Sequence, residues 1–222
     1  TKIMNRILSL GFSPFLILAT DSLILILLNT ILQKYGGKSQ GDMFITCATI
    51  AQSYLLLITS SMIGISGGTQ AILSYNYGAR RADRVKDAER NILGVMLIFT
   101  TIMFLLSRLV PRYFVLLFTS DPQYISFSVW AIHTYTLMII PLSFQYVFVD
   151  GLTALDRPKT GLALSVTRKS LFVLSAAILP VFFDAKAAFF AEPVADGVCS
   201  VLSTVVFLLL INRHLQKRCQ TV

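Results

Sequence analysis

The chain has 222 residues, of which 55% are hydrophobic and only 14% are charged, and its mean hydropathy is +0.72. Soluble domains usually contain about a quarter charged residues, so this composition is typical of a membrane protein. The formal net charge of +8 comes from basic residues scattered over the turns between apolar segments. That distribution argues against a nucleic-acid-binding protein, which gathers its basic residues on one face.

Six segments are apolar enough and long enough to cross a bilayer, whose hydrocarbon core needs about 20 helical residues. They cover roughly residues 7–32, 43–74, 91–110, 125–152, 160–183 and 187–211. The main polar run, residues 79–90, is predicted to be a basic connector at the cytoplasmic surface. We therefore predict an all-α membrane protein in which residues 1–222 form a single bundle of six transmembrane helices.

Prolines and glycines within these segments predict departures from straight helices. Pro141 removes a backbone donor and is expected to kink the fourth segment. Pro180 and Pro193 are expected to act in the same way near the ends of the fifth and sixth segments. Three glycines between residues 64 and 68 predict a bend or a tilt in the second segment.

The positions of lysine and arginine predict the orientation of the chain. With a cytoplasmic N-terminus, twelve of the 19 basic residues fall on the cytoplasmic side and five outside, while Arg168 and Lys169 lie within the fifth segment. Cytoplasmic loops of membrane proteins carry the excess of basic residues. We therefore predict a multi-pass protein of the cell (inner or cytoplasmic) membrane, with both termini cytoplasmic and its basic surface near anionic lipid.

Several charged residues lie inside the predicted spans: Asp21, Arg168, Lys169, Glu192 and Asp196. A charge at the centre of a spanning helix costs roughly 2.5–3.5 kcal/mol on insertion scales, so such residues normally face a cavity or a partner and mark a transport pathway. The sequence contains no HExxH, GxGD or nucleophile-elbow motif. These features favour a transport protein over an enzyme.

Three stretches carry a resemblance to a known family. They are residues 67–79 (GGTQAILSYNYGA) followed by Arg84-Val85-Lys86, residues 117–122 (LFTSDP), and residues 156–159 (DRPK) through Arg168-Lys169 to residues 191–196 (AEPVAD). Their order and spacing resemble the bacterial branch of the multidrug and toxic compound extrusion (MATE) family of cation-coupled efflux transporters. The resemblance implies a fold of twelve spanning helices in two six-helix lobes, of which this chain matches the C-terminal lobe. Its first residue, Thr1, also suggests a fragment of a longer protein that contains the missing N-terminal lobe.

Asp21 is the first candidate for coupling transport to ion movement. It lies roughly 21 Å from the inner boundary at 1.5 Å per residue, and it resembles the acidic residue of helix seven that many family members use to bind a cation or a proton. Burial favours the protonated form of a carboxyl group and a nearby cation favours the ionised form, so such a group can alternate between states. The alternative is a neutral carboxyl group hydrogen-bonded to Thr20 or Ser22.

Glu192 and Asp196 form an i,i+4 pair on one face of the sixth segment. Their predicted depths of roughly 8 and 13 Å from the outer boundary are close to that of Asp21, so the three carboxyl groups are candidates for one cation or proton site. The alternative is a structural salt bridge to Arg168 or Lys169. A depth mismatch of about 9 Å between these bases and Asp196 argues against direct contact.

Gln145, Tyr146, Arg168 and Lys169 are further candidates for lining a cavity. Some family members carry a helix-ten aspartate three residues before a glutamine. The corresponding position here is Leu142, which argues against the helix-ten half of a sodium site. Asp150 falls near the inner boundary, where it is expected to meet lipid headgroups or to pair with Arg168.

The resemblance implies the C-terminal half of an antiporter coupled to Na⁺ or H⁺ that exports amphiphilic organic cations. Its expected partners are membrane lipids, the N-terminal lobe and the substrate, without a cofactor beyond the coupling ion and without a metal site other than Na⁺ at Asp21. Two alternatives stay open: a flippase-like exporter of lipid-linked or amphipathic metabolites, and a half-lobe that assembles with a partner without transporting. A broad basic cavity would favour the flippase-like exporter, whereas the acidic residues favour cationic substrates.

Overall fold

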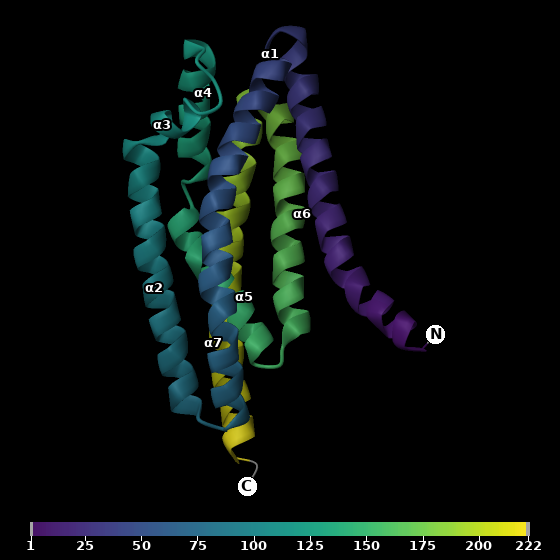
Figure 1. Ribbon diagram of the computed structural model, residues 1–222, viewed down its shortest axis with the longest axis vertical. Coiled ribbons are helices and arrows are strands. Elements are labelled where there is room, and N and C mark those ends of the chain that lie inside the picture. Colours follow the sequence, from purple (N-terminus) through teal and green to yellow (C-terminus); the bar gives the residue numbers. More distant parts are fainter. Residues whose placement is uncertain (1, 221–222) are drawn as a thin grey trace.

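The computed structural model describes the backbone of residues 2–220 and the side chains of residues 22–37 and 40–211. Its elements are α1 (Lys2–Gly78), α2 (Ala82–Leu109), α3 (Pro111–Val115), α4 (Pro122–Tyr135), α5 (Ile139–Ala154), α6 (Pro158–Phe182), the 3-10 helix η1 (Ala185–Phe190) and α7 (Ala191–Gln220). No strand occurs in this part of the chain. The predicted all-α class is confirmed (Figure 1).

Four of the described segments are long and apolar enough to cross a membrane: Gln40–Gly78, Ala82–Leu109, Pro158–Phe182 and Ala185–Ile211. The pair Pro122–Tyr135 and Ile139–Ala154, bent by 47° at a short break, passes the same test as one further span. The span predicted at residues 7–32 lies largely outside the described side chains. The chain is thus a multi-pass membrane protein, since each of these helices satisfies its own backbone hydrogen bonds within a bilayer.

Two helices joined at Gly37 make up α1. Gly37 has φ 65° and ψ −170°, a conformation that favours glycine. A side chain on the preceding Gly36 would lie 2.8 Å from the Cα atom of Gly41, so the two arms meet too closely for a larger residue. The second arm runs without a break through the glycines between residues 64 and 68. The break in α1 therefore falls at Gly37 and not at those glycines.

Pro141 explains the bend between α4 and α5. Its ring and its missing N–H act on the carbonyl group four residues earlier, at Leu137, and residues 136–138 form the turn that separates the two helices. The expected kink in this segment is confirmed by the 47° bend. The other two prolines leave their helices unbroken: α6 continues past Pro180 to Phe182, and Pro193 lies in the first turn of α7, where backbone N–H groups have no helical partner.

Residues 79–90, the predicted connector, form a short turn and the first turns of α2. Only residues 79–81 form the turn between α1 and α2, with Arg80 at φ 58°, and α2 begins at Ala82. Within its first turns, Val85, Glu89 and Ile92 are buried. The face on which they lie repeats at intervals of three and four residues, as expected of a helix that packs against a core.

The core of the bundle forms around α5, which packs against α1, α2, α6 and α7. Exposed apolar side chains cover the outward faces of the helices that surround it, among them Ile98, Ile102 and Leu105 of α2, Val166 and Leu174 of α6, and Val201 and Leu208 of α7. An apolar surface this extensive is rare on a soluble monomer. It fits a bundle surrounded by lipid.

Candidate functional site

Arg168 of α6 forms an ion pair with α7 inside the bundle. Its Nη1 atom lies 2.8 Å from Oδ1 of Asp196 and 3.4 Å from Oε1 of Glu192. The Asp196 side chain is completely buried, while 23% of the Arg168 side chain and 16% of the Glu192 side chain are exposed. The three residues, which we call the Arg168 cluster, thus run from the closed interior to an accessible surface.

Helix geometry places the two carboxyl groups on one side of α7. Residues four apart lie one above the other on a helix, so Glu192 and Asp196 can share a single guanidinium group. Tyr146 of α5 lies within electrostatic range of all three members of the cluster. The second oxygen of Asp196, Oδ2, accepts no hydrogen bond, so one acceptor in the cluster is available to a further donor or cation.

The predicted depth mismatch between Arg168 and Asp196 is wrong, because the two groups are in direct contact. Counting residues along a helix gives the height of a Cα atom, but it omits the reach of the arginine side chain and the tilt of one helix against another. The alternative prediction, a salt bridge between α6 and α7, therefore describes the structure. A coupling role of the same carboxyl groups stays a prediction.

A cavity of about 190 Å³ lies beside the Arg168 cluster, between the two arms of α1 and helices α6 and α7. It is lined by Ile24, Leu25, Gln52, Arg168, Lys169, Phe172 and Glu192. The side chain of Asp21, the first candidate for ion coupling in the sequence, lies outside the described residues.

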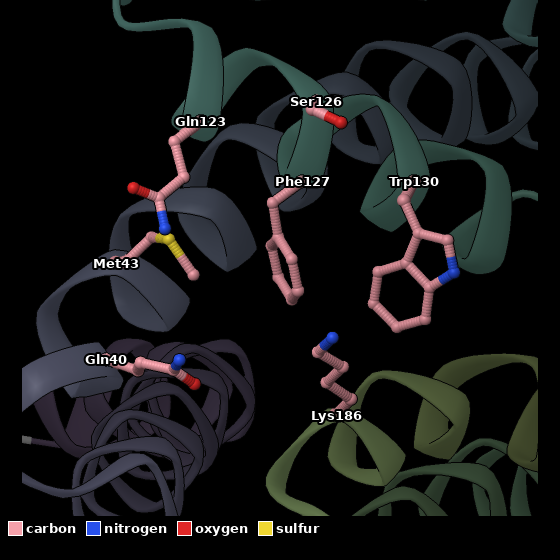
Figure 2. Close-up of a pocket in the computed structure, with 7 residues that line it drawn as sticks. All are labelled: Gln40, Met43, Gln123, Ser126, Phe127, Trp130 and Lys186. Atoms are coloured by element: carbon pink, nitrogen blue, oxygen red, sulfur yellow. The ribbon is translucent and has the colours of Figure 1, made fainter.

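A larger pocket of about 620 Å³ lies at the end of the bundle where α4 begins and η1 precedes α7 (Figure 2). It is lined by Gln40, Met43, Gln123, Ser126, Phe127, Trp130 and Lys186. Lys186 points between Phe127 and Trp130 in Figure 2, and its Nζ atom lies 5.8 Å from the centre of the Phe127 ring. We call this the outer pocket, because the orientation predicted from the basic residues places this end of the bundle outside. Its volume suits a drug-sized ligand.

Buried aromatic rings hold the outer pocket in shape. Phe189 of η1 is completely buried, and its ring centroid lies 5.3 Å from that of Phe127 and 5.5 Å from that of Trp130. Phe44 of α1 closes the group, at 5.0 Å from Phe127. The sequence pattern does not reveal this pocket, because its residues come from three segments that are distant along the chain. Phe127 and Trp130 lie three residues apart, and this spacing of two aromatic residues on one helix face is the feature of the sequence that indicates the pocket.

The remaining predicted residues lie elsewhere. Gln145 is only 4% exposed, and its Oε1 atom accepts no hydrogen bond. Asp150 accepts hydrogen bonds from Ser66 and Gln70 of α1, so the expected contact with headgroups or with Arg168 is replaced by contacts to α1. Of the four cavity-lining candidates, Arg168 and Lys169 line the smaller cavity.

Comparison with known proteins shows one consistent similarity. The MatE family model matches residues 17–179. A curated FAD transporter from Shewanella oneidensis is 26% identical over 136 residues, which cover 61% of this chain and 29% of that protein.

Solved structures agree in fold. A multidrug resistance MATE family transporter of the MOP superfamily, in its inward-facing conformation, matches 100% of this chain and 50% of that chain, with a TM-score of 0.87 at 16% identity. A MOP superfamily transporter from Pyrococcus furiosus, whose structure is described as suggesting a different function through reversed polarity of the binding pocket, matches 96% of this chain and 48% of that chain, with a TM-score of 0.80 at 17% identity.

The chain thus spans about half the length of the solved transporters that it matches and less than a third of the curated relative. The structural match to the inward-facing transporter includes every described helix of this chain. Together with the match of the family model over most of the chain, this confirms the resemblance noted in the sequence. The chain belongs to the MatE family, whose members are transporters rather than enzymes.

Proposed function

We propose that this chain forms the C-terminal six-helix lobe of a cation-coupled exporter, whose N-terminal lobe completes the central pathway. The match to one half of a full-length transporter supports this assignment. Transporters built from two repeats move substrate by rocking one half against the other around a site between them. The lobe described here would supply one wall of that site.

The Arg168 cluster and Asp21 would couple transport to a Na⁺ or H⁺ gradient. Two carboxyl groups share one guanidinium group in the cluster, so the cluster holds one acidic group more than it can neutralise. A proton or Na⁺ that binds Glu192 or Asp196 weakens the hold of Arg168 on α7, since the carboxyl group can no longer attract the guanidinium group as strongly. Ion binding would in this way change how α6 and α7 pack.

The substrate that the geometry supports best is a flat aromatic solute with negative charge. The observation that carries this proposal is Lys186, which lies between two aromatic rings in the outer pocket. Aromatic faces accept a planar ring system, and an ammonium group attracts a carboxylate or a phosphate. The relative named as an FAD transporter handles a solute of this class, which is also an amphipathic metabolite of the kind considered from the sequence.

Amphiphilic organic cations are the second candidate. Glu192 lines the smaller cavity, and Asp21 is a second acidic candidate from the sequence. However, Arg168 already engages the carboxyl group of Glu192, so this carboxyl group is less available to a cationic substrate. The anionic class is therefore the better candidate.

The experiment is transport by the complete transporter in lipid vesicles, driven by a Na⁺ or an H⁺ gradient. A flavin nucleotide and a planar organic cation of similar size are offered in parallel. We expect gradient-driven movement of the flavin, and Lys186→Gln should lower it about tenfold, the equivalent of 1.4 kcal/mol of lost interaction. Lys34→Gln is the matched control, since Lys34 is another exposed lysine, located near the Gly37 turn. Faster transport of the cation, unaffected by Lys186→Gln, would contradict the anionic assignment.

A further inference from the structure

Glu89 is a buried carboxyl group of α2 that has no hydrogen-bond partner. Only 5% of the residue is exposed, and neither Oε1 nor Oε2 accepts a hydrogen bond. Its sequence neighbours Asp87 and Arg90 are exposed. An ionised carboxyl group in such a position is strongly unfavourable, because burial removes its hydration and nothing replaces it.

Helix α5 brings a second carboxyl group to the same place. Asp150 lies close enough to Glu89 for the two charges to interact. The next residue, Gly151, has no side chain, and a Cβ atom at that position would overlap the Glu89 carboxyl group. Glu89 is therefore held against the backbone of α5, beside Asp150, in a space that only a glycine leaves open.

The two carboxyl groups have unequal surroundings. Asp150 accepts hydrogen bonds from Ser66 and Gln70 of α1, both of which are uncharged. Glu89 receives no such donor, and the charge that acts on it is that of Asp150. Donors stabilise a negative charge on Asp150, and this charge in turn disfavours a second one on Glu89. Of the two carboxyl groups, Glu89 is therefore the one that more readily keeps a proton.

We propose that Glu89 and Asp150 form a proton-binding site, in which Glu89 holds the proton and Asp150 retains it through its charge. A metal cation fits less well, since it requires about six oxygen ligands while the side chains of Ser66 and Gln70 are already engaged by Asp150. The site belongs to α2 and α5 and shares no residue with the Arg168 cluster or the outer pocket.

The location indicates what this proton site does. Glu89 lies seven residues after the start of α2, and Asp150 lies four residues before the end of α5. Both are near the end of the bundle that contains the turns from α1 to α2 and from α5 to α6, which is the lower end in Figure 1. By the predicted orientation this end is cytoplasmic. The pair is thus placed to exchange a proton with the inner aqueous phase, and loss of that proton creates repulsion between α2 and α5.

The test is infrared difference spectroscopy of the complete transporter in lipid vesicles, in sodium-free buffers from acidic to alkaline pH, without substrate and without a gradient. We expect a C=O stretching band of a protonated carboxyl group that disappears as the pH rises. Glu89→Gln should lose the Glu89 contribution to this band at every pH, and Asp150→Asn should lose that contribution at a lower pH than the wild type, because the retaining charge is gone. Asp87→Asn, which changes an exposed carboxyl group two residues from Glu89, should keep the wild-type band.

Three results would overturn the proposal: no titrating carboxyl band in the wild type, an unchanged band in Glu89→Gln, or removal of the band by NaCl but not by choline chloride at fixed pH. The last result would identify a sodium site instead. Because proton binding is measured at equilibrium, a failure here is separate from a failure of the proposed transport, which the vesicle assay tests.

Discussion

The Nη1 atom of Arg168 lies 2.8 Å from Oδ1 of Asp196, and this contact joins α6 to α7 at a point where the aspartate side chain is completely buried. The completely buried carboxylate of Asp196 has lost its water, and the guanidinium group of Arg168 compensates its charge. Removing one partner of such a pair leaves an uncompensated charge and typically costs about 3–5 kcal/mol, a large part of a domain's total stability of about 5–15 kcal/mol.

Arg168→Gln should therefore destabilise the lobe by about 3–5 kcal/mol, measured by denaturant unfolding in mixed micelles. The double variant Arg168→Gln with Asp196→Asn should recover a large part of this loss, because the completely buried side chain at position 196 then carries no charge. Arg112→Gln is the control, since Arg112 is exposed. A loss below about 1 kcal/mol for Arg168→Gln would mean that the ion pair does not stabilise the bundle.

Thr100 of α2 and Ser143 of α5 should couple weakly but measurably. Their hydroxyl oxygens are 2.8 Å apart, and both residues are completely buried. Hydrogen bonds between membrane helices contribute about 0.6 kcal/mol on average, so a double-mutant cycle of Thr100→Val and Ser143→Ala should give a coupling energy near that value. The Thr46 hydroxyl group donates to the carbonyl group of Asp42 in its own helix. Thr46→Val should therefore lower the free energy of unfolding by less than Thr100→Val does. Coupling of zero would show that the two hydroxyl groups find other partners.

The helical framework follows from sequence rules, whereas the contacts between helices do not. Pro141 predicts the break between α4 and α5 because its effect is local. The Arg168–Asp196 contact depends on how α6 and α7 are placed against each other, which residue counting leaves undetermined. Glu89 is an intermediate case. The polar composition of residues 79–90 predicts a connector at the surface, but Glu89 also follows Val85 by four residues and precedes Ile92 by three, a spacing that predicts its burial.

Gly36→Ala should destabilise the turn that joins the two arms of α1. A methyl group at this position would lie 2.8 Å from the Cα atom of Gly41 and 2.9 Å from the ring of Phe44, and overpacking of this kind costs about 1–3 kcal/mol. Gly64→Ala is the matched control, because no atom lies within 4 Å of the added methyl group. Both variants are compared by thermal unfolding in detergent. Equal midpoints for the two would contradict the close approach at this turn.

Cysteine labelling should confirm the orientation predicted from the basic residues. A cysteine in place of Lys186 should react with an impermeant thiol reagent from outside the cell, and one in place of Arg84 only after permeabilisation. Both positions are exposed, and Cys47 and Cys199 are buried, so the native thiols in the described part of the chain should react slowly. Rapid labelling at position 84 in intact cells would contradict the predicted orientation.

Asp21→Asn in the complete transporter should abolish ion-coupled export while leaving expression and membrane insertion close to those of the wild type. Asparagine keeps the size and a hydrogen-bonding oxygen of aspartate, so a purely structural carboxyl group would tolerate the change. A coupling carboxyl group would not, because it acts by gaining and losing a proton or a cation. Export is measured in vesicles at matched protein levels under an imposed gradient.

Glu192→Gln should give a smaller loss of coupled export than Asp21→Asn, because Arg168 still binds Asp196 when the more distant of its two partners is neutral. Asp196→Asn should give a larger loss than Glu192→Gln, since it removes the partner at 2.8 Å and shifts the guanidinium group toward Glu192. If Arg168 moves between the two carboxyl groups during coupling, the loss of coupled export should decrease in the order Asp21→Asn, Asp196→Asn, Glu192→Gln. Wild-type ion coupling in Asp21→Asn would instead move the coupling site to the N-terminal lobe.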